Sequence, residues 1–286
     1  MSPLVDISKR IADTDGRERR QVRNAEHGRW PNAAPQTAEL VARVDRHLVS
    51  LVAPDSIDAE QYRGLRYVVE HMEKPDEPGG TLVGVCSPLS GDGKSLTALN
   101  LAGSLAQDSN ARVLLVEVDL RRPSVTIGNH LTLRKPRAQG LVDAILDPSL
   151  SLEHVVQYLP AFNLGVLPAG RCSSSPYEAL KSPQFGELLA QARRRYDYVI
   201  LDAPPVVPVP DCRLIAKLVD GFIMVVAARR TPRVALEEAL NLLGPEKVMG
   251  LVFNGVDRST SRHYGYYGYG YGHPNPRRWW ARLLGR

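Results

Sequence analysis

The sequence predicts an α/β fold whose mainly parallel central sheet carries helices on both faces. Apolar runs rich in Val, Ile and Leu recur without the polar alternation of half-exposed strands, as expected of strands buried on both faces. These runs are residues 81–86, 112–118, 163–167, 198–201, 222–227 and 248–253. Segments with helical periodicity lie between them, at residues 95–107, 178–194, 213–219 and 234–243. Alternating strands and helices favour a parallel sheet wrapped by helices.

The length and composition suit one large domain of this class. The chain has 286 residues, of which 43% are hydrophobic, close to the usual share in globular proteins. We expect this domain to span residues 37–257. Residues 1–36 are polar and rich in Arg, which is typical of a disordered or loosely ordered extension. Residues 258–286 are expected to form a flexible, basic tail rich in tyrosine.

Two helices are expected before the first strand. Apolar residues recur on one helical face from residue 36 onwards, at Leu40, Val41, Val44, Leu48 and Leu51. Pro54 and Asp55 end this helix. Ser56 has the position of an N-cap for a second helix over residues 57–72.

Several classes of protein are excluded by composition. The longest apolar stretch, residues 214–228, contains Lys217 and Asp220, so it falls short of the ~18 uninterrupted apolar residues that span a membrane. No secretory leader is expected, because the polar N-terminus has no apolar run. The three cysteines have no metal-binding spacing. They therefore indicate a reducing compartment rather than a disulfide scaffold or a zinc site.

The charge is unevenly distributed along the chain. The net charge of +5 comprises +2 from residues 1–36 and +6 from residues 258–286, which leaves −3 for the remainder. The basic character therefore belongs to the two ends. We expect no nucleic-acid partner for the central domain.

A glycine-rich loop follows the first predicted strand. Residues 87–95 read Ser-Pro-Leu-Ser-Gly-Asp-Gly-Lys-Ser and precede a helix, so backbone N–H groups and the helix N-terminus can face phosphate oxygens. Lys94 is expected beside the β- and γ-phosphates of ATP, and Ser95 is expected to bind Mg²⁺. The strict pattern has Gly where Pro88 stands, so the alternative is a Gly-rich turn without a ligand. The strand–loop–helix context favours nucleotide binding and a P-loop NTPase fold.

The nucleotide-binding residues are assigned from this loop, its following helix and the end of the last strand. They are Ser90, Gly91, Asp92, Gly93, Lys94, Ser95, Leu96 and Asn254.

Acidic residues end two further strands. Glu117 and Asp119 stand at the end of the apolar run of residues 112–118, and Asp202 follows residues 198–201. An unpaired buried charge is costly, so a carboxylate in such a position is typical of a functional site. Asp202 has the place of the acidic residue that holds Mg²⁺ through water. The alternative is that it caps the turn that follows.

With these motifs the sequence resembles the bacterial tyrosine kinase (BY-kinase) family, the autokinases of capsule and exopolysaccharide export. The resemblance covers residues 56–271 and includes the phosphate loop and the acidic boxes at residues 117–123 and 202–205. It implies an ATP-dependent tyrosine autokinase that regulates polysaccharide polymerisation and export. The implied catalytic residues are Lys94, Glu117, Asp119 and Asp202. The implied Mg²⁺ ligands are Ser95, Asp119 and Asp202.

A charged helix face matches the family's assembly element. Glu60, Arg63 and Arg66 recur at three-residue spacing and share one face of a helix. The resemblance implies that this face joins protomers into a ring, and the planar Arg fork suits such bidentate contacts. The alternative is that the three side chains satisfy one another within one chain.

The tail carries a cluster of tyrosines interleaved with glycines. This composition opposes a packed strand or helix, because glycine loses too much conformational freedom on ordering. The resemblance implies that the tyrosines accept phosphate from a neighbouring protomer. The alternative is a low-complexity, weakly self-associating tail. The predicted acceptors are Tyr264, Tyr266, Tyr267, Tyr269 and Tyr271.

One residue departs from the family pattern in the second acidic box. The family usually has Asp where Glu117 stands, in a position proposed to accept the tyrosine proton or to organise the metal. Glutamate keeps the charge but adds one methylene, which shifts the carboxylate by about 1 Å, a distance that matters in a tight site. Lys94, Mg²⁺ and Asp119 are expected to support at least a slow reaction.

The resemblance also implies partners and a location. Fused family members carry a membrane-spanning activator domain, so a separate membrane-spanning activator or polysaccharide co-polymerase is expected here, together with a tyrosine phosphatase. The protein is then cytoplasmic and held at the inner face of the membrane through that partner. Two alternatives stay open: a positioning or partitioning ATPase, which usually has lysine where Leu89 stands, and a nucleotide-gated scaffold with weak catalysis.

Overall fold

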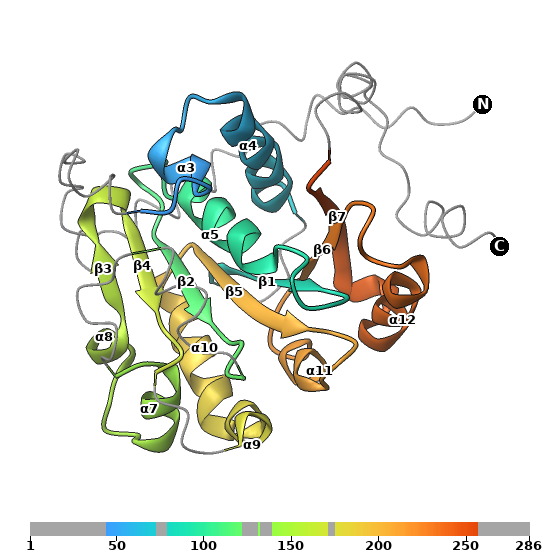
Figure 1. The fold of residues 1–286 in the computed structure, drawn as a ribbon. Helices are drawn as coiled ribbons and strands as arrows, with labels where there is room; N and C mark the ends of the chain where they lie inside the picture. The colour runs from blue at the N-terminus through green and yellow to red at the C-terminus, as the bar shows by residue number, and fades with distance from the viewer. Residues whose placement is uncertain (1–43, 73–78, 122–130, 132–138, 171–174, 257–286) are drawn as a thin grey trace, which may run out of the picture.

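The structure, a computed structural model of the chain, describes residues 44–72, 79–121, 131, 139–170 and 175–256. The predicted extension of residues 1–36 and the predicted tail of residues 258–286 lie outside the described residues. A central sheet with helices on both faces accounts for most of the described chain (Figure 1). The predicted α/β fold with a mainly parallel sheet is confirmed.

The sheet has the strand order β3-β4-β2-β5-β1-β6-β7 in the described part of the chain. Its strands are β1 Thr81–Ser87, β2 Val113–Glu117, β3 Gln157–Leu159, β4 Leu164–Leu167, β5 Tyr198–Pro205, β6 Gly221–Ala227 and β7 Val248–Asn254. All neighbours pair in parallel except β3, which is antiparallel to β4. Each of the six predicted strands is present. β3 is a three-residue edge strand, too short to give a periodic signal.

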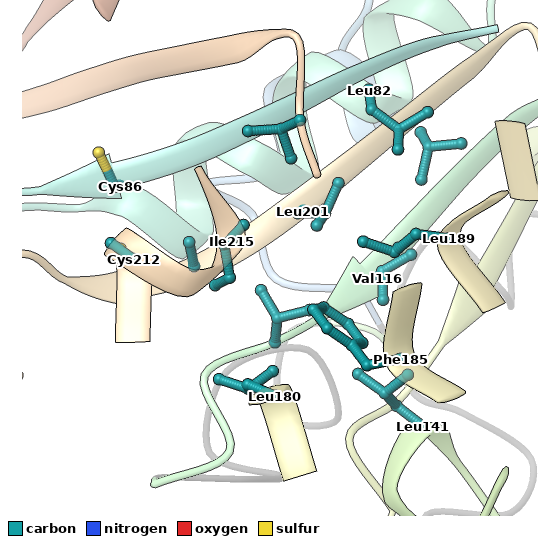
Figure 2. Packing of buried hydrophobic residues seen from close by; sticks show 14 of the residues in the cluster. Leu82, Cys86, Val116, Leu141, Leu180, Phe185, Leu189, Leu201, Cys212 and Ile215 are labelled. Carbon is teal, nitrogen blue, oxygen red and sulfur yellow. The ribbon is translucent and has the colours of Figure 1, made fainter. Parts of the chain in front are cut away.

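The sheet separates two hydrophobic layers. Successive strand residues point to opposite faces, so Val83 and Val85 of β1 join one layer, and Leu82 and Cys86 join the other. On the first face lie α3 Val49–Val52, α4 Ile57–Glu70 and α5 Lys94–Leu105. On the second face lie α7 Leu141–Leu146, α8 Leu152–Val155, α9 Pro176–Lys181, α10 Pro183–Arg195, α11 Asp211–Ile215 and α12 Arg233–Leu243. In Figure 2, Phe185 of α10 lies among Val116, Leu141 and Leu180 in this second layer.

The second predicted helix is confirmed as α4. Its N-cap is Ser56, whose Oγ accepts a hydrogen bond from Ala59 N at 3.2 Å. This bond satisfies one of the free N–H groups of the first turn. The helix ends at Glu70, two residues before the predicted boundary.

The first predicted helix, over residues 36–51, is wrong in the part that the structure describes. Only α3 is helical there, and a turn precedes it. Asp45 accepts a hydrogen bond from His47 N at 2.9 Å through Oδ1, and such local bonds compete with a continuing helix. Leu48 and Leu51 are nevertheless buried in the first layer.

The predicted helix over residues 178–194 is two helices, α9 and α10. Ser182 between them has an extended backbone, because Pro183 disfavours helical geometry in the residue before it. The Oγ of Ser182 then accepts a hydrogen bond from Phe185 N at 3.3 Å and caps α10. α11 begins and ends earlier than the predicted span of residues 213–219. The short helices α7 and α8 have no predicted counterpart.

The interpretation that every strand is buried on both faces is wrong for β7. Phe253 in this strand is 56% exposed, and most of its other residues are half-buried. The reason is its place at the edge of the sheet, next to β6 alone.

Candidate functional site

The predicted motifs meet at one edge of the sheet. β2, β5 and β1 are parallel neighbours, so their carboxyl ends lie together. Glu117 of β2 is opposite Asp202 of β5 in the strand register, and Ser87 of β1 is opposite Pro205. Ligands of open α/β sheets bind at the carboxyl ends of their strands. The fold therefore brings the glycine-rich loop and both acidic boxes into one site.

The loop has the backbone of a phosphate-binding turn. Gly91 and Gly93 have φ angles of 87° and 99°, in a region that other residues rarely adopt. Gly93 is the N-cap of α5, so Lys94 and Ser95 form the first turn of the helix. The positive end of this helix faces the site. Ser90 and Gly91 are exposed, whereas Lys94 and Ser95 are buried and Leu96 packs against the first layer.

Lys94 is directed at the acidic residues behind the loop. Its Nζ donates a hydrogen bond to Asp119 Oδ2 at 2.8 Å and lies 3.7 Å from Asp202 Oδ1. Only 7% of Lys94 is exposed. Burial lowers the pKa of Lys94, but the charges of Asp202 and Asp119 outweigh this and raise it above its usual value. The ammonium group is therefore protonated at neutral pH.

Asp202 is the most buried acid of the site. It is fully buried, and this burial raises the pKa of its carboxyl group to about 6, although the charge of Lys94 acts in the opposite direction. Its Oδ1 lies 3.7 Å from Lys94 Nζ as an ion pair, but neither carboxylate oxygen accepts a hydrogen bond within the part of the chain that the structure describes. Buried polar atoms nearly always have a partner, so this carboxylate is positioned for a ligand rather than for the fold.

Three residues fit the Mg²⁺ ion that P-loop folds employ. The hydroxyl of Ser95 lies 3.3 Å from Lys94 Nζ, within the same buried group as Asp119 and Asp202. Mg²⁺ is bound through one or two carboxylates, waters and phosphate oxygens. The unpartnered oxygens of Asp202 supply the hard acceptors that such an ion requires. The predicted ligands Ser95, Asp119 and Asp202 are therefore chemically suited to it.

Glu117 lies on the side of the site toward β4. It is 1% exposed, and its Oε2 accepts a hydrogen bond from Ala169 N at 3.0 Å. Ala169 follows β4, so the longer side chain reaches the loop beyond the neighbouring strand. The charge of Glu117 also contributes to the raised pKa of Asp202. Its carboxylate therefore belongs to the same electrostatic cluster.

Asp92 and Asn254 contact the loop itself. The carboxylate of Asp92 accepts hydrogen bonds from Leu89 N at 3.1 Å and from Thr231 Oγ1 at 2.8 Å. The side-chain amide of Asn254 donates to Asp92 O at 3.0 Å. Both residues were predicted to bind nucleotide, and the structure places them where they shape the loop.

Three residues of the site were not predicted from the sequence. Arg230 Nη2 donates to Gly91 O at 3.1 Å, and Thr231 donates to Asp92. Both come from the connection between β6 and α12, 139 positions away in sequence, and no local motif marks them. Asp211 of α11 is fully buried and pairs with Arg121 through two bonds of 2.9 and 3.0 Å. The sequence marks only one member of this pair, because Arg121 stands in the second acidic box whereas Asp211 belongs to no motif.

The predicted assembly face makes contacts within the protomer. Arg63 Nε donates to Glu60 Oε2 at 2.7 Å. Arg66 donates to Ser104 O on α5 and to Glu70, each at 2.9 Å. Local pairing therefore exists, while the Glu60 side chain stays 63% exposed. A docking role for this face stays a prediction.

The predicted tyrosine acceptors lie outside the described residues. β7 ends at Asn254, which contacts the phosphate loop. The chain thus leaves the sheet at the edge that holds the candidate site. Among the described residues, no helix has the length and apolar character needed to cross a membrane.

Comparison with known proteins shows which family shares this site. The AAA domain family matches residues 83–216, which hold the loop and both acidic boxes. The chain is 33% identical over 229 residues to tyrosine-protein kinase YwqD of Bacillus subtilis, covering 79% of this chain and 93% of that protein. It is 32% identical to the succinoglycan biosynthesis transport protein ExoP of Rhizobium meliloti, covering 74% of this chain but 27% of that longer protein.

A solved structure gives the same result. The kinase domain of VpsO superposes with a TM-score of 0.61 at 30% identity, covering 74% of this chain and 97% of that domain. The predicted resemblance is therefore confirmed over nearly the whole length of a curated relative. The chain belongs to the bacterial tyrosine kinase family.

Proposed function

We propose that this protein is an ATP-dependent tyrosine kinase that phosphorylates the C-terminal tyrosine cluster of neighbouring protomers, and that this phosphorylation regulates polysaccharide polymerisation and export. The observation that carries the proposal is the convergence of Lys94, Asp119 and Asp202 behind the phosphate loop, where the oxygens of Asp202 accept no hydrogen bond from the described residues. Relatives named tyrosine-protein kinase support the choice of acceptor.

The loop and the start of α5 hold the phosphate chain of ATP. Their N–H groups and the positive end of the helix attract the anionic oxygens. Lys94 is protonated and already directed into the site. A phosphate oxygen competes with Asp119 for its Nζ, because charged hydrogen bonds of both kinds are of similar strength. Lys94 then stabilises the charge that develops on the transferred group.

Ser95, Asp119 and Asp202 are the residues that would hold Mg²⁺. When bound, this ion supplies positive charge that neutralises the oxygens of the β- and γ-phosphates. Asp211 and Arg121 fix the segment after Asp119 against α11 through their paired bonds. Such positioning matters because phosphoryl transfer depends mainly on alignment and electrostatics.

Glu117 is proposed to accept the proton of the tyrosine hydroxyl or to organise the site electrostatically. We predict that Glu117→Gln lowers the rate of autophosphorylation by about 100-fold, since general bases contribute about that much. Glutamine removes the charge but keeps an oxygen that can accept from Ala169 N. Glu117→Asp keeps the charge and is expected to retain or raise the rate. Initial rates of phosphotyrosine formation measure both.

The same two variants distinguish a chemical role from a structural one. If Glu117 only holds the loop after β4, glutamine preserves activity and aspartate loses it, because aspartate is too short for the bond to Ala169. The ranking of the two variants is then reversed. Equal activity of all three proteins would also contradict the proposed role.

The proposed phosphate transfer between neighbouring protomers requires that the protomers assemble. The first tyrosine of the cluster, Tyr264, stands eight positions after Val256, a span of at most ~29 Å when fully extended. The tail thus leaves near its own site and also within reach of an adjacent protomer. A ring held by the face of Glu60, Arg63 and Arg66 would present the tail to the neighbour.

We predict that Glu60→Lys prevents assembly and lowers tail phosphorylation while nucleotide binding is retained. Glu60 is largely exposed, and an exposed ion pair such as that with Arg63 contributes little to stability. Reversal of its charge should therefore repel a neighbouring protomer and leave the fold intact. Arg66 is less suitable, because its bond to Ser104 O holds α4 on α5. Light scattering measures the mass of the assembly.

The matched control is Glu237→Lys on α12. Glu237 also forms an exposed helical pair, with Arg233, but outside the predicted face. We expect the control to assemble as the wild type does. Loss of assembly in both variants, or in neither, would contradict the role of the α4 face.

A separate membrane-spanning protein is proposed as the activator. ExoP, a transport protein, is much longer than the matched region, which supports a kinase domain working beside a membrane component. The protein would then lie at the inner face of the membrane through this partner, and a tyrosine phosphatase would reverse the modification. Addition of the partner's cytoplasmic segment should raise the rate of autophosphorylation.

Incubation of the purified protein with Mg-ATP, followed by detection of phosphotyrosine, tests the proposed function. Phosphotyrosine in the tail supports the kinase. Nucleotide hydrolysis without phosphotyrosine, even with the partner's segment present, would instead indicate a positioning-type ATPase. Nucleotide binding with neither reaction would indicate a scaffold.

A further inference from the structure

We propose that Arg230, Thr231 and Asn254 are positioning residues that orient the peptide groups of the phosphate loop before nucleotide binds. This inference rests on the proposed nucleotide site and goes beyond it, because two of the three residues lie outside every nucleotide-binding motif of the sequence. Arg230 and Thr231 contact the loop from the segment after β6, and Asn254 contacts it from the last position of the neighbouring strand β7.

The first contact fixes the carboxylate of Asp92. This residue is 2% exposed, and its two oxygens accept from Leu89 N and from Thr231 Oγ1. The hydroxyl oxygen of Thr231 also accepts from Ala227 N at 3.0 Å. A hydroxyl has a single proton to donate, so Thr231 is oriented as the donor to Asp92. The loop is thereby joined to the end of β6.

The next two contacts fix the directions of two carbonyl groups. Gly91 O accepts from Arg230 at 3.1 Å, and Asp92 O accepts from Asn254 at 3.0 Å. In a planar trans peptide the N–H of the following residue points opposite to the carbonyl. The N–H groups of Asp92 and Gly93 therefore point away from Arg230 and Asn254. These N–H groups are therefore free of the two donors and are available to a phosphate bound in the proposed nucleotide site.

This arrangement favours anion binding for two reasons. Successive N–H groups that face one way form a concave site for anions. The carbonyl oxygens, which would repel phosphate, are turned toward donors on the opposite side. Gly93 cannot be replaced here, since a Cβ on it would overlap the amide of Asn254. The side chains thus hold a conformation that the glycines alone only permit.

The decisive experiment compares Thr231→Val with Thr231→Ser by calorimetric titration with Mg-ADP. Valine has the shape of threonine without the hydroxyl, so the bond to the charged Asp92 is lost. We expect Thr231→Val to weaken Mg-ADP binding by about tenfold, the usual cost of a hydrogen bond to a charged group. Serine keeps the hydroxyl and should bind within about threefold of the wild type.

Hydrogen exchange in the nucleotide-free protein gives an independent measurement. The amides of residues 90–95 should exchange faster in Thr231→Val than in the wild type, because the loop is no longer held in one conformation. Arg233→Gln is the matched control. Arg233 begins α12, directly after the same connection, and pairs with Glu237 of that helix, so affinity and exchange should both be unchanged.

Two results would overturn the inference. One is unchanged Mg-ADP affinity in Thr231→Val, and the other is equal weakening by valine and serine, which would indicate a packing role. Failure of the wild type to bind Mg-ADP would contradict the nucleotide site together with this inference. A wild type that binds Mg-ADP but forms no phosphotyrosine would contradict the kinase proposal alone, and the valine–serine comparison would still decide the role of Thr231.

Discussion

Lys94→Met is expected to lower tail phosphorylation by about 100-fold or more, the usual loss when one preorganised donor to a developing charge is removed. Methionine fills similar space but has no cation for the β- and γ-phosphates. Lys94 is also the counter-charge of Asp119 and Asp202. Its loss leaves two buried carboxylates without an opposite charge, so the midpoint of thermal unfolding should fall by several degrees. Phosphotyrosine detection and thermal unfolding measure the two effects.

Lys247→Met is the matched control for this substitution. Lys247 is also partly buried and donates to Val219 O at 3.1 Å, but it precedes β7 and therefore lies at the opposite edge of the sheet. We expect its phosphorylation to match that of the wild type. Wild-type phosphorylation in Lys94→Met itself would contradict the assignment of the nucleotide site.

The Lys94→Met protein also tests transfer between chains. An active protein that lacks residues 258–286 offers a site without acceptors, and Lys94→Met offers acceptors without an active site. When the two are mixed with Mg-ATP, we expect phosphotyrosine in the Lys94→Met tail. Phosphorylation of the wild type alone, with none in the mixture, would indicate transfer within one chain.

The meeting of the loop and the acidic boxes at one edge of the sheet can be predicted from the sequence, because the signals for it are local. The loop and the acidic residues stand at the end of apolar runs in the sequence, and adjacent parallel strands bring their carboxyl ends together. The structure confirms a loop between β1 and α5, but a shorter one than predicted, because Ser87 ends β1 and Lys94 and Ser95 begin α5.

Interactions between distant segments could not be predicted in this way. Thr231 and Arg230 reach the loop from 139 positions away, and their own segment looks like an ordinary polar connection. The division of the predicted helix at Ser182 was missed because helical periodicity takes no account of Pro183, which disfavours helical geometry in the residue before it. The helix expected from residue 36 failed where Asp45 forms a local turn, because hydrophobic periodicity takes no account of competing side-chain bonds.

Asp202→Asn is expected to abolish most activity and yet raise stability. The burial that raises the pKa of Asp202 to about 6 means that folding places a charged carboxylate in an unfavourable environment at neutral pH. Asparagine removes that charge. Without nucleotide and Mg²⁺, we expect the midpoint of thermal unfolding at pH 7.5 to rise by roughly 2–5 °C. Phosphotyrosine formation should fall by about 100-fold or more, because the acceptor for Mg²⁺ is lost.

Asp197→Asn provides the contrasting control. Asp197 is also a buried carboxylate, but it accepts from Arg112 N at 2.9 Å and lies 3.5 Å from Arg112 Nε. It precedes β5, at the opposite edge of the sheet from the site. Its replacement breaks a partnered buried charge, so stability should fall by several degrees while activity persists. A fall in stability for both variants would contradict the view that Asp202 is held for a ligand.

The pH dependence of the unfolding midpoint is a second test of whether Asp202→Asn stabilises the protein. The pKa of Asp202 is higher in the folded protein, about 6, than the ordinary value of 3.8, so its cost to stability is absent below the lower value and grows as pH rises through the higher one. The difference in unfolding midpoint between Asp202→Asn and the wild type should therefore be small near pH 4 and reach its full size above about pH 7. Addition of Mg-ADP should reverse the order, because the wild type then gains binding energy from the carboxylate of Asp202 that the Asp202→Asn variant lacks. The cost of burying a charged Asp202 that accepts no hydrogen bond from the described residues is then offset by the ligand, and an Asp202→Asn variant that shows no pH-dependent gain would contradict this explanation.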